Sequence, residues 1–206
     1  MKKRILIAAL CLAAVVAAAL IFHALYQPSS SAETAGKRIN KMQVNRTIGS
    51  VEDAYRTAAF AAVCMVEKKH PSTYEDWGAG SKQISTDFTV RILRTTNPDE
   101  GAVGDTVLMR MRGGETEDAI LEVSASNPDH VVEGQTYLIF FSLLDASDPE
   151  HPVYHPLGAE HGIFEQTDSS DDSSWKALYG DRTIDMSTLV PTDAADVPLL
   201  SLFSEP

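Results

Sequence analysis

Apolar and polar residues alternate in two stretches near the middle of the chain. In residues 85–96, STDFTVRILRTT, every second position from Phe88 to Ile92 is apolar, and Thr89 and Arg91 lie between them. Successive side chains of a β-strand point to opposite faces, so a two-residue period predicts a strand with one buried face.

The second alternating stretch is GDTVLMRMRGG, residues 104–114. One face would hold Val107, Met109 and Met111, and the other Leu108, Arg110 and Arg112. The glycine pair that follows predicts the end of the strand.

Other segments add a helix and further strands. Ser50 and Asp53 resemble a capping box, which predicts a short helix over 51–59. Residues 60–68 read as a buried strand, with continuation of the helix as the competing interpretation because the segment is rich in alanine. Residues 137–144 are apolar on both faces, as in a central or doubly covered strand. One or two short strands are expected around Tyr154 and 163–164.

About five such strands, joined by loops that contain glycine, predict a mainly β fold built on a small closed or nearly closed barrel. The predicted barrel core is Val63, Met65, Phe88, Val90, Ile92, Val107, Met109, Met111, Tyr137, Ile139, Phe141, Ile163 and Phe164.

The N-terminus carries an apolar run of 22 residues, 5–26, interrupted by His23 and preceded by three basic residues. This length suffices to cross a bilayer and exceeds the apolar part of most cleavable signal peptides. We therefore expect a single-pass membrane protein whose C-terminal domain lies outside. The alternative is secretion after cleavage near Ala32, which small residues precede.

The chain then divides into four regions: a signal anchor or signal peptide (1–26), a stalk (27–49), the barrel domain (50–167) and an acidic C-terminal tail that is partly packed (168–206). The segment 70–83 is interpreted as a connection between strands, because it contains Pro71, Gly78 and Gly80.

Charge and cysteine content limit the expected partners and covalent cross-links of the part of the chain beyond residue 46. The chain has 17 basic residues (Lys and Arg) and 29 acidic residues (Asp and Glu). Seven of the basic residues and one of the acidic residues lie in the first 46 positions, so the rest of the chain has ten basic and 28 acidic residues, a net charge of −18. Such a field repels phosphate backbones, so nucleic acid is not an expected partner. Only Cys64 lies in this part, which excludes an intrachain disulfide there.

Arg110 and Arg112 are the first candidates for a binding site, because barrels can bind ligands on an outer sheet face where cations and aromatics interleave. No aromatic residue lies between 89 and 136. The sequence therefore favours a solvated face on which the arginines pair with acids such as Glu115 or Glu117.

The segment 151–161, HPVYHPLGAEH, offers His151, His155 and His161 as candidate metal ligands. Prolines directly after the first two histidines exclude the regular helix that an H-E-x-x-H zinc site needs, so the ligands would have to converge from loops. No other cofactor is indicated. Cys64 lies in an apolar segment and is expected to be a buried hydrophobe, so no catalytic residues are predicted.

The order of segments DFTVRILRTT, VGDTVLMRMRGG, VEGQTYLIFFSLL and HGIF resembles an uncharacterised family of exported proteins of Gram-positive bacteria. The resemblance covers roughly half the chain. It implies a small five-stranded OB-like barrel with a short flanking helix, preceded by an N-terminal transmembrane or signal helix. It also implies a distant similarity to the inhibitory domain of tissue inhibitors of metalloproteinases.

We therefore expect a binding or interaction module outside the cytoplasm, anchored or secreted, and not an enzyme. Its partner would be a cell-surface or secreted protein or another envelope component. The alternatives are a protease-inhibitor-like domain, suggested by fold resemblance alone, and a metal-dependent hydrolase that uses the histidines of 151–161. The inhibitors bind the protease zinc through an N-terminal cysteine held by disulfides, a feature that this chain lacks.

Overall fold

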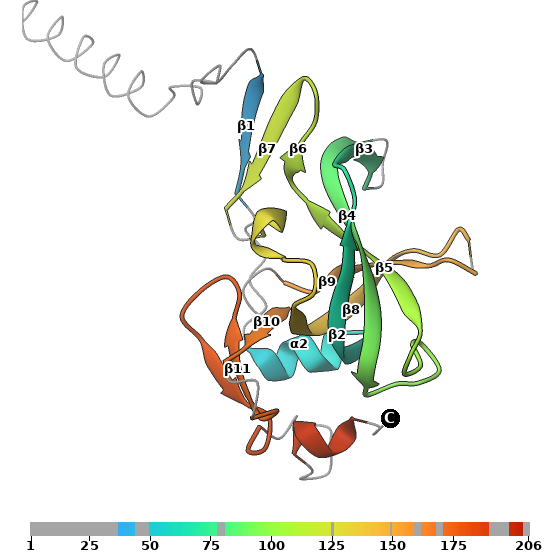
Figure 1. Cartoon of the computed structure of the whole chain (residues 1–206), viewed down its shortest axis with the longest axis vertical. Helices are drawn as coiled ribbons and strands as arrows, with labels where there is room; N and C mark the ends of the chain where they lie inside the picture. The colour runs from blue at the N-terminus through green and yellow to red at the C-terminus, as the bar shows by residue number, and fades with distance from the viewer. Residues whose placement is uncertain are drawn as a thin grey trace, which may run out of the picture. The chain divides into compact units, whose positions relative to one another are not determined.

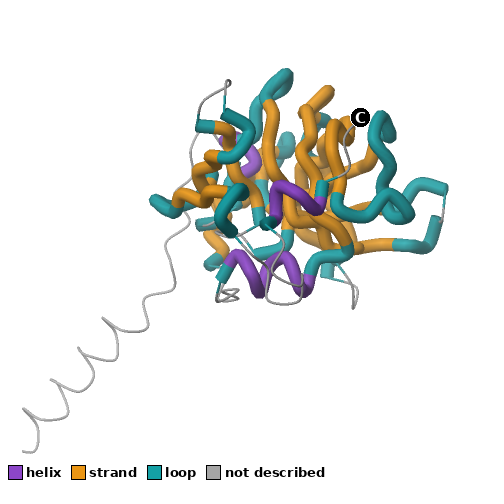
Figure 2. Tube along the Cα trace, turned by 90° about the horizontal axis from the view of Figure 1, so that it is seen from below, coloured by secondary structure: helices purple, strands orange, loops and turns teal. Residues whose placement is uncertain are grey.

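Strands make up most of the described chain, and its helical segments are short (Figure 2). The computed structural model describes residues 37–43, 50–77, 81–124, 126–148, 150–158, 162–167, 171–189 and 198–203. Within these ranges no helix has both the length and the apolar character to cross a bilayer. The predicted membrane segment, 5–26, lies outside the described residues.

Five strands form a closed barrel (Figure 1). They are β2 (Phe60–Lys69), β4 (Lys82–Thr95), β5 (Thr106–Arg112), β8 (Thr136–Asp145) and β9 (Val153–Pro156). Around the barrel β2 pairs with β4, β4 with β5, β5 with β9, β9 with β8, and β8 with β2. The β5–β9 pairing is parallel and the other four are antiparallel. The prediction of a mainly β fold with a small barrel and a short helix is confirmed.

The barrel interior is filled by every second side chain of these strands, as the alternation predicted for β4 and β5. The buried residues of this core are Phe60, Ala62, Cys64, Val66, Phe88, Val90, Ile92, Met109, Met111, Val131, Tyr137, Ile139, Phe141, Tyr154, Ile163 and Tyr179. Val107 packs against them while partly exposed.

The prediction was wrong for β2, where it placed Val63 and Met65 inside. The interior face of β2 instead carries Cys64 and Val66, and Val63 packs outside the barrel. Both faces of this strand are covered, so apolar residues occupy odd and even positions alike. Alternation then contains no information about which set points inward.

A second apolar layer covers the outer faces of β2 and β8. It is built by α2 (Val51–Thr57), β10 (Ile163–Gln166), β11 (Ser174–Ala177), β12 (Thr183–Asp185) and the 3-10 turn η2 (Leu199–Leu202). The largest side chains buried in this layer include Phe140 of β8, Phe164 of β10 and Trp175 of β11. The Ser50 hydroxyl accepts a hydrogen bond from the Asp53 amide at 3.1 Å, which caps α2 as predicted.

The C-terminal region is therefore more than a partly packed tail. β10 pairs with β8, β11 with β10, and β12 with β11, so residues 174–185 extend the sheet. Phe164, predicted in the barrel core, faces this outer layer instead. Acidic and serine residues at 168–174 suggested a solvated segment, and they concealed the apolar residues after them, such as Trp175 and Ile184.

A separate small sheet contains β1 (Arg38–Met42), β7 (Ala119–Val123) and β6 (Gly114–Glu115) in the order β1-β7-β6. β1 pairs in parallel with β7 and lies within the range predicted as a stalk. The predicted connection at 70–83 also contains a strand, β3 (Thr73–Asp76), which pairs with β4. β1 and β3 are short and mostly exposed, so they lack the apolar alternation that would predict them.

Trp175→Ala tests whether the C-terminal region belongs to the folded domain. The Trp175 side chain is fully buried, and its indole N–H donates to the Asp172 carbonyl at 2.8 Å. We expect the substitution to lower the free energy of unfolding of the full-length chain by about 3–5 kcal/mol, measured by urea denaturation. Val132→Ala is the control: this side chain is 50% exposed, so its loss should cost less than about 0.5 kcal/mol. Equal effects of the two changes would show that residues 174–185 do not stabilise the barrel.

Candidate functional site

The candidate histidines of the segment 151–161 do not form a metal-ligand set in the described residues. His151 is exposed, and its Nδ1 lies 3.0 Å from a carboxylate oxygen of Asp148. His155 lies on β9, where its Nδ1 donates to the Pro156 carbonyl at 3.0 Å. Across the ranges that the structure describes, no three His, Cys, Asp or Glu side chains are placed to hold a metal ion. His161 lies outside these ranges, so its role stays a prediction.

Cys64 is buried inside the barrel as a free cysteine, as predicted. Burial raises the pKa of its thiol far above the usual value, so the sulfur stays protonated and is a poor nucleophile.

Arg110 points outward from β5, as alternation predicted, but it is not solvated. Its guanidinium donates twice to the carboxylate of Asp87, the residue directly opposite on β4, with both distances 2.8 Å. A carboxylate oxygen of Glu75 on β3 lies 3.2 Å away, and 11% of the Arg110 side chain is exposed. The hydrogen bonds to Asp87 raise the Arg110 pKa, against the effect of burial. The predicted pairing with Glu115 or Glu117 was wrong, because the strand β3 that brings Glu75 to this face was not predicted.

Arg112, two residues further along the same face, packs on an aromatic ring. The guanidinium carbon lies 4.2 Å from the centre of the Trp77 ring, a cation–π contact. The Trp77 indole N–H donates to the hydroxyl of Ser85 at 2.7 Å, and the His155 ring meets the indole edge-on at 6.0 Å. The aromatic partner was missed because Trp77 precedes the interval 89–136 in which the sequence lacks aromatics, and reaches this face after β3.

Two buried polar atoms on this face have no hydrogen-bond partner in the described part of the chain: Arg112 Nε and Gln83 Oε1. Ser85 lies directly opposite Arg112 in the β4–β5 ladder, and Gln83 lies two positions before Ser85 on β4, so all three share the outer face. Burial lowers the pKa of Arg112, and it also lowers the pKa of His155, where the charge of Arg112 acts in the same direction. We call Trp77, Gln83, Ser85, Arg112 and His155 the Arg112 cluster.

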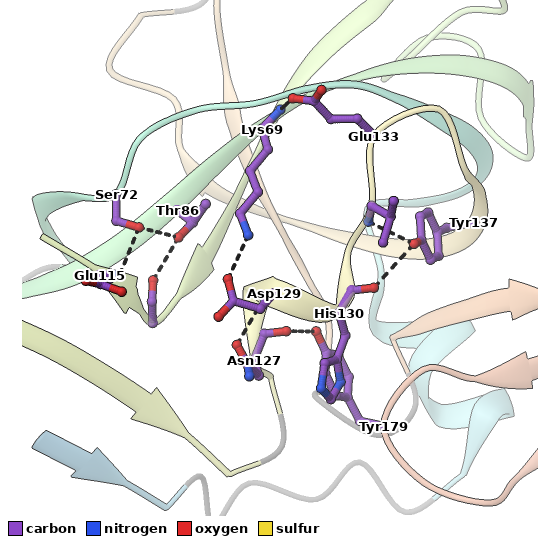
Figure 3. A network of polar contacts seen from close by, with 12 residues as sticks. Lys69, Ser72, Thr86, Glu115, Asn127, Asp129, His130, Glu133, Tyr137 and Tyr179 are labelled. Carbon is purple, nitrogen blue, oxygen red and sulfur yellow. Dashed lines mark hydrogen bonds and ion pairs between the residues drawn. The ribbon is translucent and has the colours of Figure 1, made fainter. Parts of the chain in front are cut away.

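A second feature is a cleft of about 570 Å³ lined by Lys69, His70, Pro71, Ser72, Glu115, Asp129, Val131, Val132 and Glu133. Its polar network is drawn in Figure 3. The ammonium of Lys69 lies 2.7 Å from the Asp129 carboxylate, and the Lys69 amide donates to Glu133 at 2.6 Å. Glu115 pairs with Lys37, and His70 lies 2.8 Å from the Thr89 hydroxyl. Since these charged groups already bind each other, they connect neighbouring segments of the fold and leave few free groups for a ligand in the cleft.

The glycine pair after β5 lies beside Ser72, which lines this cleft. Gly113 and Gly114 have φ of +107° and +118°, which non-glycine residues rarely adopt. A Cβ on Gly114 would lie 2.2 Å from the Ser72 hydroxyl. That hydroxyl lies 2.9 Å from the Thr86 hydroxyl, which donates to the Gly113 carbonyl at 2.9 Å (Figure 3). The glycines therefore let the chain turn from β5 into β6 against this hydroxyl pair.

Arg110→Ala tests whether the ion pair beside the Arg112 cluster supports the barrel. The change leaves the carboxylates of Asp87 and Glu75 near each other without their cation. We expect the free energy of unfolding to fall by about 1–3 kcal/mol in urea denaturation. Arg91→Ala, which removes a half-exposed guanidinium from the same face of β4, should cost less than about 1 kcal/mol. Adding Asp87→Ala to Arg110→Ala should recover part of the loss; a loss no larger than that of Arg91→Ala would contradict this assignment.

Comparison with known proteins leaves the function to be argued from this geometry alone. No protein-family model matches the chain, and no curated protein and no solved structure matches it significantly. The Arg112 cluster, with its stacked cation and two unpartnered polar atoms, is accordingly the candidate functional site.

Proposed function

We propose that this protein is a binding or interaction module outside the cytoplasm, and that its ligand binds on the outer face of β4 and β5. We propose further that residues 5–26 anchor it in the membrane, with secretion after cleavage near Ala32 as the alternative. The apolar length and the preceding basic residues support the anchor.

We propose that the barrel is of the OB type. Its closed set of five strands, with a parallel pair that joins β5 to β9, supports this assignment. The barrel's second and third strands along the chain are β4 and β5, and OB barrels bind oligomeric ligands on the face of those two strands. Fold alone is a poor guide to function, so the proposal depends on what this face carries.

The observation that carries the proposal is the Arg112 cluster. The outer faces of β2 and β8 are covered by the second apolar layer, whereas the face of β4 and β5 holds Trp77, an arginine without a carboxylate partner in the described residues, and two buried atoms without hydrogen bonds. Such unpartnered groups are rare in folded proteins, and each calls for an explanation, such as a bound water or a rearrangement when a ligand binds.

Site-specific photo-crosslinking in intact cells tests this function. A photoreactive residue replaces Thr73, which is exposed on β3 and lies directly opposite Ser85, or Lys176, which is exposed on β11. We expect the full-length protein to form a discrete covalent adduct from position 73 and none from position 176. Adducts from both positions, or from neither, would contradict a ligand on the β4–β5 face.

A further inference from the structure

Among the arginines of β4 and β5, Arg112 differs from the others because no carboxylate of the described residues lies within ion-pair distance of it. β4 and β5 contain four arginines, and three of them lie within ion-pair distance of a carboxylate: Arg91 with Glu67, Arg94 with Asp172, and Arg110 with Asp87 and Glu75. Arg112 has no carboxylate at that distance in the described residues. In a domain with so many acids, this side chain keeps its charge available for a ligand.

The surroundings of Arg112 fix the orientation of its planar guanidinium. Trp77 stacks on it at 4.2 Å, and the hydrogen bond from the indole to Ser85 holds Trp77 in place. A guanidinium held in this way loses little freedom on binding, and its parallel N–H groups match the two oxygens of a carboxylate. Gln83 lies on the same outer face, and its unpartnered Oε1 is buried, so this oxygen meets a donor of the ligand only if the amide turns outward on binding. A peptide offers both groups, because main-chain N–H donors flank every acidic side chain.

Charge around the cluster selects among ligands that carry carboxylates. Glu75 and Asp87 pair with Arg110 next to the cluster. The pKa of Asp145 is lowered mainly by its hydrogen bonds with Ser147 and also by the charge of Arg110, so this carboxylate lies near the cluster too. With −18 beyond residue 46, the domain repels polyanionic chains such as acidic polysaccharides. A single carboxylate flanked by basic side chains suits both Arg112 and the acidic surroundings. The carboxylate binds Arg112, and the basic side chains beside it in the ligand lie near the surrounding acids.

We propose that Arg112, Trp77 and Gln83 form a subsite for a single carboxylate of a protein partner, displayed between basic residues. This inference rests on the proposed function and names the chemistry of its ligand. The carboxylate receives N–H donors from the two terminal nitrogens of Arg112, whose Nε is buried. A main-chain N–H of the partner donates to Gln83 after its amide turns outward, and flanking lysines or arginines lie toward Glu75 and Asp145.

The test uses the full-length chain in detergent micelles, titrated with the peptide acetyl-Gly-Lys-Asp-Lys-Gly-amide. The chain has two tryptophans, so two indole N–H signals report separately by NMR on Trp77 in the subsite and on Trp175 in the buried outer layer. We expect the peptide to shift the Trp77 signal and leave the Trp175 signal in place. Replacing Asp by Asn in the peptide should weaken binding about 10- to 100-fold, because the charge-assisted hydrogen bonds are lost.

Variants of the protein separate the subsite from general charge attraction. Arg112→Gln and Arg112→Lys should each weaken binding at least about tenfold, since lysine keeps the charge and loses the bidentate geometry. Arg91→Gln removes one positive charge elsewhere on β4 and should change affinity by less than about twofold. An unchanged Trp175 signal in each variant confirms that the fold is retained, so a loss of binding cannot be attributed to unfolding.

Several results would overturn the proposal: equal affinity for the Asp and Asn peptides, a Trp77 shift that survives Arg112→Gln, or no shift with either peptide. Glucuronate that binds as tightly as the Asp peptide would overturn the assignment to a protein partner. These outcomes remain distinct from failure of the proposed function, because a position-73 adduct in cells would persist if a ligand binds this face through other chemistry.

Discussion

Burial of both faces of β8 is the constraint on which the rest of the fold depends. Residues 137–141 are all almost completely buried, with Tyr137, Ile139 and Phe141 inside the barrel and Leu138 and Phe140 outside it. A strand that is apolar on both sides must be covered on both sides. The chain meets this requirement by closing the barrel on one side of β8 and by returning its C-terminal segment, with Trp175, over the other (Figure 1).

That division leaves β4 and β5 as the strands whose outer face can be polar. Asp87, Arg110 and Arg112 occupy it, and β3 and Trp77 fold over part of it without making it an apolar core. Charged groups that are partly removed from water interact more strongly than they would on an open surface. The packing that stabilises one side of the barrel thus leaves, on the other side, a face where single charges dominate the local electrostatics.

How much the sequence predicted depends on how many faces of each strand are buried. β4 and β5 have one core face, so their alternation predicted Phe88, Ile92 and Met109 inside and the arginines outside, and the structure agrees. β2 has two covered faces, and there the prediction placed Val63 on the wrong side. The Arg112 cluster could not be predicted for two reasons. Trp77 reaches it through the local pairing of β3 with β4, where the pattern indicated only a connection, and His155 reaches it through the pairing of β5 with β9, which joins residues distant in sequence. The alternation of apolar and polar residues predicted only that Arg112 points outward.

The energetics of Arg112 explain why such a group can persist in the unbound chain. A buried donor without an acceptor costs about 1–3 kcal/mol. Stacking on Trp77 offsets part of this cost, because a cation–π contact in a partly desolvated place contributes about 0.5–2 kcal/mol. The remainder is a cost that the folded domain carries, because the buried Nε is out of reach of any group that meets the terminal N–H groups from solvent. In the proposed complex, the surrounding acids would act over a longer range, about 8 Å at physiological salt, and would attract the basic residues of the partner before contact. Attraction and recognition would therefore act on different side chains of the same partner, so that neither a purely basic nor a purely acidic ligand could satisfy both.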